Sequence, residues 1–228
     1  MTKAIKCVLC LGAVLLVGAC TSPQLRTTGE VSAEGLARME GTNFDELWVS
    51  PGLKAASFDR IVIEPTSVAY QEVGEGPRYE LTRMSARRSA FPIPAPQRER
   101  IESRFRQYIA AAVDDSGHYL RVESATSGVL QLRAGLIEFV SSVPPEQPQY
   151  RAMVTSVGHA TLAVELRDSQ SGEVLVRAVK HDKAGPRGQQ LVHADRVSAW
   201  PEMNRQLDRW ARDVRGLLVQ LHEMDTAS

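Results

Sequence analysis

The stretch that decides the fold reads Thr161-Leu162-Ala163-Val164-Glu165-Leu166-Arg167, followed by Asp168-Ser169-Gln170-Ser171-Gly172. In the first part apolar side chains alternate with polar ones, and this period of two is typical of a β-strand with one buried face. The second part has the composition of a turn, and residues 174–181 again have the composition of a strand. We therefore predict an antiparallel hairpin over these segments.

Two segments outside the hairpin have a helical period. Residues 96–113 begin with a proline that suits a first helical turn, and apolar residues then recur at steps of three and four. Residues 203–221 show the same spacing. Each stripe side chain contributes about 1.5–3 kcal/mol when buried, so both stripes are expected in the core. They are Ile101, Phe105, Tyr108, Ile109, Ala112 and Val113, and Met203, Leu207, Trp210, Val214, Leu217, Leu218 and Leu221.

Further strands are predicted over residues 58–70, 119–122 and 129–140, and residues 48–53 are expected as a short edge segment. In residues 129–140 the alternation changes phase after Gly135, which indicates a β-bulge there. The predicted fold class is α+β. It is a two-layer sandwich in which a mostly antiparallel sheet of about five strands packs against two amphipathic helices.

The first 20 residues have the layout of an export signal. Lys3 and Lys6 form a basic start, and residues 8–17 are apolar. Val17-Gly18-Ala19-Cys20 follows as a cleavage region of small residues that ends in cysteine. The apolar run is too short for a bilayer span, which needs about 20 residues. These last four residues resemble the lipobox of bacterial lipoproteins, in which the cysteine thiol is acylated and becomes the first residue after cleavage. The alternative is an ordinary secretory signal that happens to contain a cysteine.

The domain division follows from this reading. Residues 1–19 are expected as a lipoprotein signal peptide, residues 20–43 as the acylated Cys20 with a flexible tether, and residues 44–228 as a single periplasmic domain. Cys7 and Cys10 leave with the signal, so the mature chain would hold no free thiol and no disulfide. Loss of Lys3 and Lys6 leaves 25 basic against 27 acidic residues, a charge balance that does not predict a nucleic-acid partner. Thr21 after the cysteine resembles the pattern of lipoproteins sent to the outer membrane.

From Trp48 to Leu221 the chain resembles a bacterial lipoprotein family catalogued as domain of unknown function 3313. The resemblance implies an envelope lipoprotein with no assigned activity and no known catalytic residue. The segments that carry it are Trp48-Val49-Ser50-Pro51-Gly52, Phe58-Asp59-Arg60-Ile61-Val62-Ile63-Glu64-Pro65, Leu130-Gln131-Leu132-Arg133-Ala134, Gly158-His159-Ala160 through Glu165 and Asp168 to Ser171-Gly172-Glu173, and Trp210-Ala211.

Chemistry-bearing residues form no recognisable catalytic, metal or cofactor motif. His159, Glu165, Asp168, His181 and Asp182 lie on or beside the predicted hairpin, but they lack the close ligand pairs of a zinc site. We interpret them as a solvated sheet face with its turn. The sequence also has no Gly-x-Ser-x-Gly elbow and no phosphate-binding glycine loop. No catalytic residue, no metal and no cofactor is therefore predicted.

The segment from Arg83 to Pro96 is basic and rich in proline, which predicts a loop. Arg83, Arg87 and Arg88 are the candidate residues for contact with an anionic group, such as lipid headgroups or an acidic partner. The alternative is a solvated loop without a partner.

Together these features predict a non-enzymatic lipoprotein on the periplasmic face of the outer membrane. It would be held there by acyl chains on Cys20, and its partner would be an envelope protein, the cell wall or a lipid. One alternative is a hydrolase of envelope material, which requires a pocket joining a serine or histidine to a carboxylate. Another is a carrier of an apolar ligand, which requires a deep cavity between sheet and helices.

Overall fold

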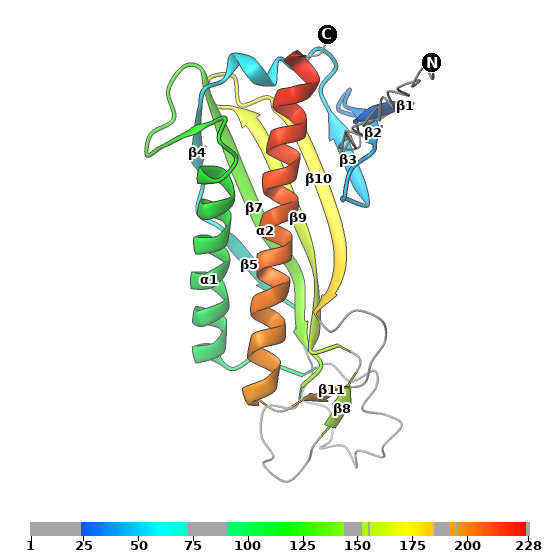
Figure 1. Ribbon diagram of the computed structural model, residues 1–228, viewed down its shortest axis with the longest axis vertical. Helices are drawn as coiled ribbons and strands as arrows, with labels where there is room; N and C mark the ends of the chain where they lie inside the picture. The colour runs from blue at the N-terminus through cyan, green and yellow to red at the C-terminus, as the bar shows by residue number, and fades with distance from the viewer. Residues whose placement is uncertain are drawn as a thin grey trace, which may run out of the picture.

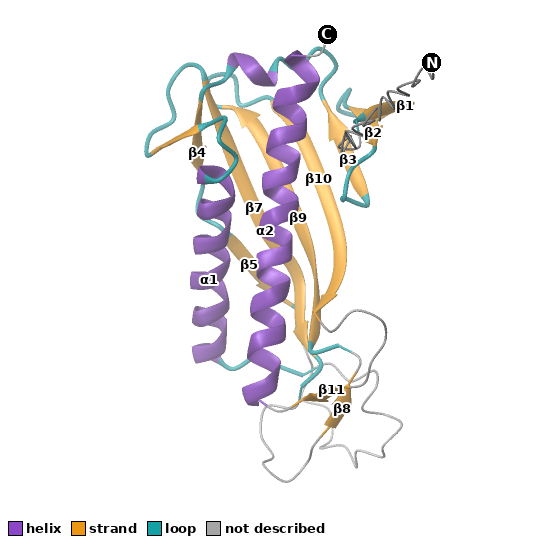
Figure 2. Cartoon of the chain, in the orientation of Figure 1, coloured by secondary structure: helices purple, strands orange, loops and turns teal. Residues whose placement is uncertain are grey.

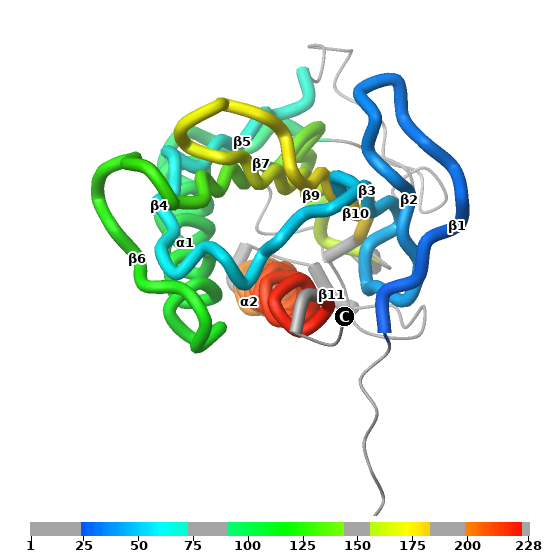
Figure 3. Tube along the Cα trace, turned by 90° about the horizontal axis from the view of Figure 1, so that it is seen from above, coloured from blue at the N-terminus to red at the C-terminus, as the bar shows by residue number. Residues whose placement is uncertain are grey.

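Two helices pack side by side on one face of a large sheet (Figures 1 and 3). The computed structural model describes residues 24–72, 91–143, 152–154, 156–184, 192–194 and 196–226. The helices are α1 (Ala95–Asp114) and α2 (Arg196–Thr226). The two-layer α+β arrangement predicted from the sequence is therefore confirmed.

Nine strands form the main sheet in the described part of the chain, in the order β1-β2-β3-β10-β9-β7-β4-β6, and β5 pairs with β7 (Figure 2). Strand β7 pairs antiparallel with β9 and parallel with β4 and β5, and β4 pairs parallel with β6. A small second sheet joins β8 (Ala152–Val154) to β11 (Val192–Ala194). The bounds of the main strands are β1 Arg26–Val31, β2 Ala37–Glu40, β3 Glu46–Val49, β4 Arg60–Ile63, β5 Ser67–Tyr70, β6 Leu120–Val122, β7 Val129–Ser141, β9 Gly158–Asp168 and β10 Val174–Ala184.

The predicted hairpin is present as β9 and β10, with Leu162 opposite Lys180 and Val164 opposite Ala178. Its turn forms as the composition indicates: the Asp168 carboxylate accepts a hydrogen bond from the Gln170 N–H at 2.7 Å. Gly172 has a φ of 72°, a left-handed conformation that glycine adopts without steric cost. Leu162, Val164 and Leu166 are buried against the helices, so this hairpin is a central part of the core.

The sheet is larger than the five strands predicted, and its additional strands come from two places. Residues 26–40, expected within a flexible tether, form β1 and β2. The tether prediction is wrong for these residues. Every residue of β1 is exposed, so the strand has no alternation of apolar and polar residues by which the sequence could have shown it. Backbone pairing to β2 holds it in place. Likewise, the single strand expected over residues 58–70 is split into β4 and β5, and β3 lies between β2 and β10 rather than at an edge.

The bulge predicted at Gly135 occurs three residues later. Leu136 is buried in phase with Leu132 and Ala134, so the alternation passes through Gly135 unchanged. The register against β9 shifts between Ile137 and Val140, where Glu138 has a φ of 55°. Gly135 serves a different purpose, because a Cβ there would lie 2.8 Å from the Ser67 hydroxyl of β5. A larger residue at this position would require the Ser67 side chain to rotate away.

Both predicted apolar stripes are buried between the helices and the sheet, except that Tyr108 is only partly covered. Helix α2 is longer than the stripe predicts and includes Pro201 in its second turn. Phe105 and Trp210 are among the largest fully buried side chains. The layer between sheet and helices is thus filled by side chains, which places any cavity at its ends.

The opposite face of the sheet, which no described helix covers, carries a charged row across five strands. We use this term for Arg133, Glu165, Arg177, Trp48 and Arg38, which lie opposite one another in register on β7, β9, β10, β3 and β2. Glu165 contacts Arg167 at 2.6 Å and Arg177 at 3.6 Å, and the Arg38 guanidinium lies 5.7 Å from the Trp48 ring centroid. Each arginine of the row also contacts a glutamate outside it: Arg133 contacts Glu64, Arg177 contacts Glu34 and Arg38 contacts Glu30.

Candidate functional site

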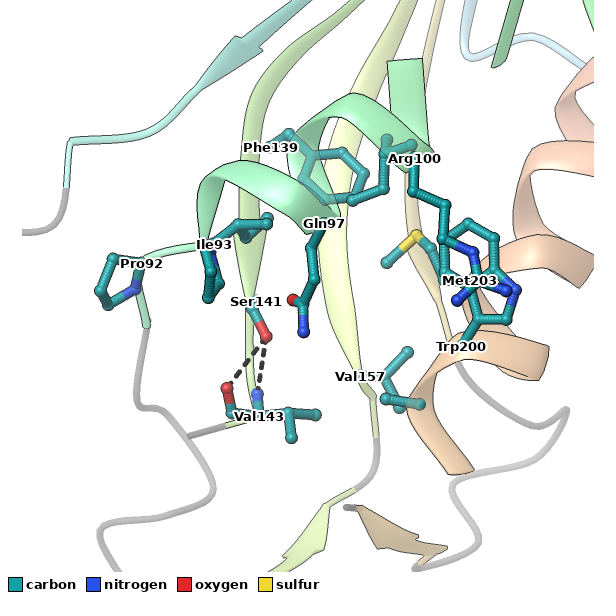
Figure 4. Close-up of a pocket in the computed structure, with 13 residues that line it drawn as sticks. Pro92, Ile93, Gln97, Arg100, Phe139, Ser141, Val143, Val157, Trp200 and Met203 are labelled. Carbon is teal, nitrogen blue, oxygen red and sulfur yellow. Dashed lines mark hydrogen bonds between the residues drawn. The ribbon is translucent and has the colours of Figure 1, made fainter. Parts of the chain in front are cut away.

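A pocket lies where the N-terminal turns of both helices meet the far end of β7 (Figure 4). The chain enters α1 through Pro92-Ile93-Pro94, and the fixed φ of these prolines sets the approach to the first helical turn. From the other side, Trp200 and Met203 come from the first turns of α2. We call this feature the end pocket. Residues 92–101, 139–143, 157 and 199–203 contribute to it, so four separate segments of the chain build the pocket.

The walls of the end pocket are apolar and well buried, and they enclose a cavity of about 90 Å³. For comparison, an engineered apolar cavity of about 150 Å³ accepts a benzene molecule, and pockets for drug-sized ligands measure about 300–1,000 Å³. The end pocket therefore has room for a group of side-chain size and not for a whole lipid. Its wall residues are Ile93, Ile101, Phe139, Val143, Val157 and Met203.

Two polar side chains reach into the end pocket. The Ser141 hydroxyl donates to the Val143 carbonyl at 3.1 Å and accepts from the Val143 N–H at 3.0 Å, so it is already engaged. The Gln97 amide points into the pocket from α1 (Figure 4) and makes no hydrogen bond to another described side chain or backbone group. Gln97 is the polar group that an occupant would meet.

The exposed rim of the end pocket carries a stacked pair. The Arg100 guanidinium lies 3.8 Å from the ring centroid of Trp200, which is within the range of a cation–π contact. Among the described residues no carboxylate lies within ion-pair distance of Arg100, whereas all three arginines of the charged row have such a partner. The rim therefore offers a cation beside an apolar cavity.

Tyr70 of β5 fixes the first turns of α1 next to the pocket. Its hydroxyl lies 3.2 Å from both the Arg98 carbonyl and the Glu102 carboxylate, and Arg98 stacks on its ring at 4.5 Å. Burial and then the nearby Glu102 charge raise the pKa of Tyr70 above its ordinary value, so the phenol stays a neutral donor. The Arg98 Nε also donates to the Ile93 carbonyl at 2.7 Å. These contacts hold one wall of the end pocket in place.

The candidate residues named from the sequence are not part of this pocket. Cys20, Arg83, Arg87 and Arg88 lie outside the described residues. In the hairpin, His159 and His181 lie on the uncovered face, and Asp182 on the covered face accepts a hydrogen bond from Gln206 of α2. Asp168 is held in its turn and Glu165 in the charged row. The described residues contain no cluster of three metal-ligating side chains.

Sequence reasoning placed Ile101 and Met203 in the core but did not find the site that they line. Gln97, Arg100 and Trp200 were missed altogether, because nothing in their own surroundings marks them as neighbours. The pair of prolines at positions 92 and 94 was the only local signal, and it indicated a loop. The pocket arises when α1 and α2 are laid on the same sheet.

The end pocket, as the described residues build it, lacks the features that a hydrolase or a carrier of an apolar ligand requires. Among the residues that line the end pocket there is a serine but no histidine, aspartate or glutamate, so the lining does not supply the pair of groups that hydrolysis requires. The cavity lies at one end of the layer between sheet and helices and measures about 90 Å³, whereas a carrier would need a deep cavity that encloses an apolar chain. No described helix is long and apolar enough to cross a membrane.

Comparison with known proteins assigns the family. The model of the family described as protein of unknown function (DUF3313) matches residues 26–214, and the chain belongs to this family. The match includes β1 and β2, which agrees with their place in the sheet. No curated protein is significantly similar to the chain in sequence.

Several solved structures resemble the chain weakly. Protein XCC0632 from Xanthomonas campestris, of family DUF330, is 13% identical with a TM-score of 0.40, covering 74% of this chain and 88% of that one. The PelC dodecamer protein from Paraburkholderia phytofirmans is 13% identical with a TM-score of 0.36, covering 77% and 96%. A neuraminyllactose-binding hemagglutinin homolog from Helicobacter pylori is 10% identical with a TM-score of 0.36, covering 78% and 93%. Likenesses at this level transfer no function to this chain.

Proposed function

We propose that this protein is a lipid-anchored component of the cell envelope that acts by binding a partner rather than by catalysis. The signal and Cys20 would place it on the periplasmic face of the outer membrane, and the end pocket would be its binding site. The observation that carries the binding role is the end pocket itself: a buried apolar cavity with one unengaged amide and a cation at its rim. Such a combination of apolar walls and few polar groups is typical of binding sites.

The position of β1 makes the proposed anchor a short one. Strand β1 begins at Arg26, six residues after Cys20, and an extended chain spans at most about 3.5 Å per residue. Acyl groups on Cys20 would therefore hold the domain within about 20 Å of the lipid surface. The 23-residue tether over residues 21–43 that composition predicts would have allowed a much greater distance. The anchor would accordingly hold the β1 end of the domain close to the membrane.

The anchor can be tested by metabolic labelling with an alkyne analogue of palmitate. We expect label on the wild-type protein and its recovery with the outer membrane, and we expect Cys20→Ser to lose both. Cys10→Ser is the matched control, because it removes a thiol that leaves with the signal, and it should retain label and location. An unlabelled wild-type protein that stays in solution would refute the anchor.

The binding role can be tested by photo-crosslinking in cells. A benzoylphenylalanine in place of Ala95, which is exposed in the first turn of α1 beside the pocket, should give a discrete crosslinked product. The same amino acid in place of Arg106, exposed further along α1, should not. Equal products from both positions, or none from either, would contradict binding at the end pocket.

A further inference from the structure

We infer that the end pocket receives one aliphatic side chain of a partner polypeptide, and that Arg100 holds an acidic group next to that side chain. This inference rests on the proposed binding role and adds the chemical identity of the partner. Three features of the pocket lead to it: the size of the cavity, the unengaged Gln97 amide and the unpaired charge of Arg100.

The size of the cavity restricts the occupant to a small apolar group. Its volume of about 90 Å³ is well below the roughly 150 Å³ that accepts benzene, so a branched aliphatic side chain such as valine or leucine is the largest group that enters fully. An acyl chain of a membrane lipid is several times too long. Protein interfaces are commonly anchored by single side chains in such buried pockets.

The Gln97 amide favours a polypeptide over a hydrocarbon as the occupant. A buried amide that loses water without gaining a hydrogen-bond partner opposes binding. An alkyl group offers no such partner, whereas the backbone on either side of a peptide side chain carries both N–H and C=O groups. Because Gln97 points into the cavity, a side chain that enters brings its own backbone within reach of this amide.

The charge of Arg100 favours an acidic neighbour to the inserted side chain. Its guanidinium stacks on Trp200, an arrangement that engages the face of the group and leaves the N–H donors at its edge available. No carboxylate of the described residues pairs with it. A carboxylate meets this donor edge in bidentate geometry, so the rim is complementary to an Asp or Glu side chain or to a chain terminus.

A binding experiment with defined probes tests the inference. The full chain is reconstituted in phosphatidylcholine nanodiscs, and the Met203 methyl group, assigned with Met203→Leu, reports binding by nuclear magnetic resonance. The probes are acetyl-Leu-Asp-amide, acetyl-Leu-Asn-amide and acetyl-Gly-Asp-amide. We expect the Leu-Asp probe to bind about three- to fivefold more tightly than the Leu-Asn probe, as for an exposed ion pair, and the Gly-Asp probe to give no shift.

Variants separate the contribution of each group. Arg100→Gln should abolish the difference between the Leu-Asp and Leu-Asn probes while both still bind. Gln97→Leu should weaken both probes equally. Val157→Phe should abolish binding by filling the cavity while it keeps the Met203 reporter, and Val143→Phe serves the same purpose if that variant does not fold. Arg106→Gln on α1 is the matched control, since it removes an exposed arginine away from the pocket and should change nothing.

Three outcomes would overturn the inference. Equal binding of the Asp and Asn probes would remove the role of Arg100, and equal binding of the Leu and Gly probes would remove the role of the cavity. A Met203 shift caused by phosphatidylglycerol vesicles and by none of the peptides would identify a lipid as the occupant instead. The proposed function fails separately, when no crosslink forms at position 95 in cells, so a crosslink without peptide binding would refute only this inference.

Discussion

The two faces of the central sheet differ although they belong to the same strands. On the covered face, Leu162, Val164 and Leu166 of β9 are buried under α1 and α2. On the other face, the residues between them lie in or beside the charged row, where Glu165 contacts arginines of its own and the neighbouring strand. Successive residues of one strand therefore serve two environments, because their side chains alternate between the faces.

This difference shows where stability and recognition reside in the molecule. Burial of apolar surface stabilises the covered face, whereas ion pairs between exposed side chains contribute little. Each arginine of the charged row contacts a glutamate in or beside the row, so the positive charges on this face are paired. The end pocket differs from both faces, because its apolar walls are buried as in the core, while among the described residues the Gln97 amide has no hydrogen-bond partner and Arg100 no carboxylate partner. It is therefore the region best suited to bind another molecule.

The largest expected effect comes from a pair of adjacent residues in β9. Leu162→Ala should lower the free energy of unfolding by about 2.5–5 kcal/mol, because it leaves a cavity in the fully buried layer. Thr161→Ala on the uncovered face should lower it by no more than about 1 kcal/mol, although it removes a 2.8 Å contact to the His181 ring. Urea denaturation of both variants measures the difference. Similar losses at the two positions would contradict the conclusion that the covered face contributes more to stability than the uncovered face.

The next effect tests a charge on the covered face. Lys180 of β10 contacts Asp213 of α2 at 2.7 Å, and their side chains are 19% and 13% exposed. Lys180→Met or Asp213→Leu alone should cost about 1.5–3 kcal/mol, because each leaves the other charge without its partner. The double variant should recover much of this loss, since replacing both partners removes the unpaired charge. A double-mutant cycle by urea denaturation measures the coupling, and additive losses would show that the pair does not interact.

A smaller effect is expected from two glycines in contact with neighbouring strands. At Gly158 an added Cβ would lie 2.6 Å from the Val140 carbonyl oxygen, so Gly158→Ala should cost about 1–3 kcal/mol by displacing backbone. At Gly135 the added Cβ would meet the exposed Ser67 hydroxyl at 2.8 Å, and a rotation of that side chain relieves the contact. Gly135→Ala should therefore change stability by less than about 0.5 kcal/mol. Thermal unfolding of the two variants would contradict this account if Gly135→Ala were the more damaging.

The smallest effect is expected within the charged row. Glu165→Gln removes the charge that Arg167 and Arg177 share and should cost about 0.5–1 kcal/mol at low salt, because both arginines remain in contact with water, with side chains 28% and 39% exposed. The loss should shrink in 1 M sodium chloride, because the Debye screening length there is only about 3 Å. Glu173→Gln is the control, because Glu173 is exposed and has no ion pair with a described residue. A loss several times larger, or one that is independent of salt, would show that the uncovered face contributes more than exposed pairs do.

Much of the fold could be predicted because its signals are local. The β9–β10 hairpin follows from a period of two and a turn with Asp168 and Gly172, and both helices follow from apolar stripes. The strands β1 and β2 could not be predicted from apolar periodicity, since every residue of β1 is exposed and only backbone pairing fixes it. The bulge was placed at Gly135 because glycine is a common bulge residue, whereas the structure makes it at Glu138.

The candidate site was beyond the reach of sequence reasoning for a related reason. Arg100 and Trp200 are 100 positions apart in the chain, and their contact depends on how α1 and α2 pack. Gln97 looks like an ordinary helix residue until Phe139 and Met203 surround the space that it faces. Its significance comes from the missing partner, which is a property of the assembled molecule.

The sequence by itself determined the helices, the hairpin and the residues that form the core, because periodicity and turn chemistry act between residues close along the chain. It also supplied the signal pattern ending at Cys20, which is read as a linear motif. Only the tertiary structure decided the number and order of strands, the position of the bulge and the existence of the end pocket. These depend on contacts between distant segments, and the free energy of such contacts is set by packing and pairing in three dimensions.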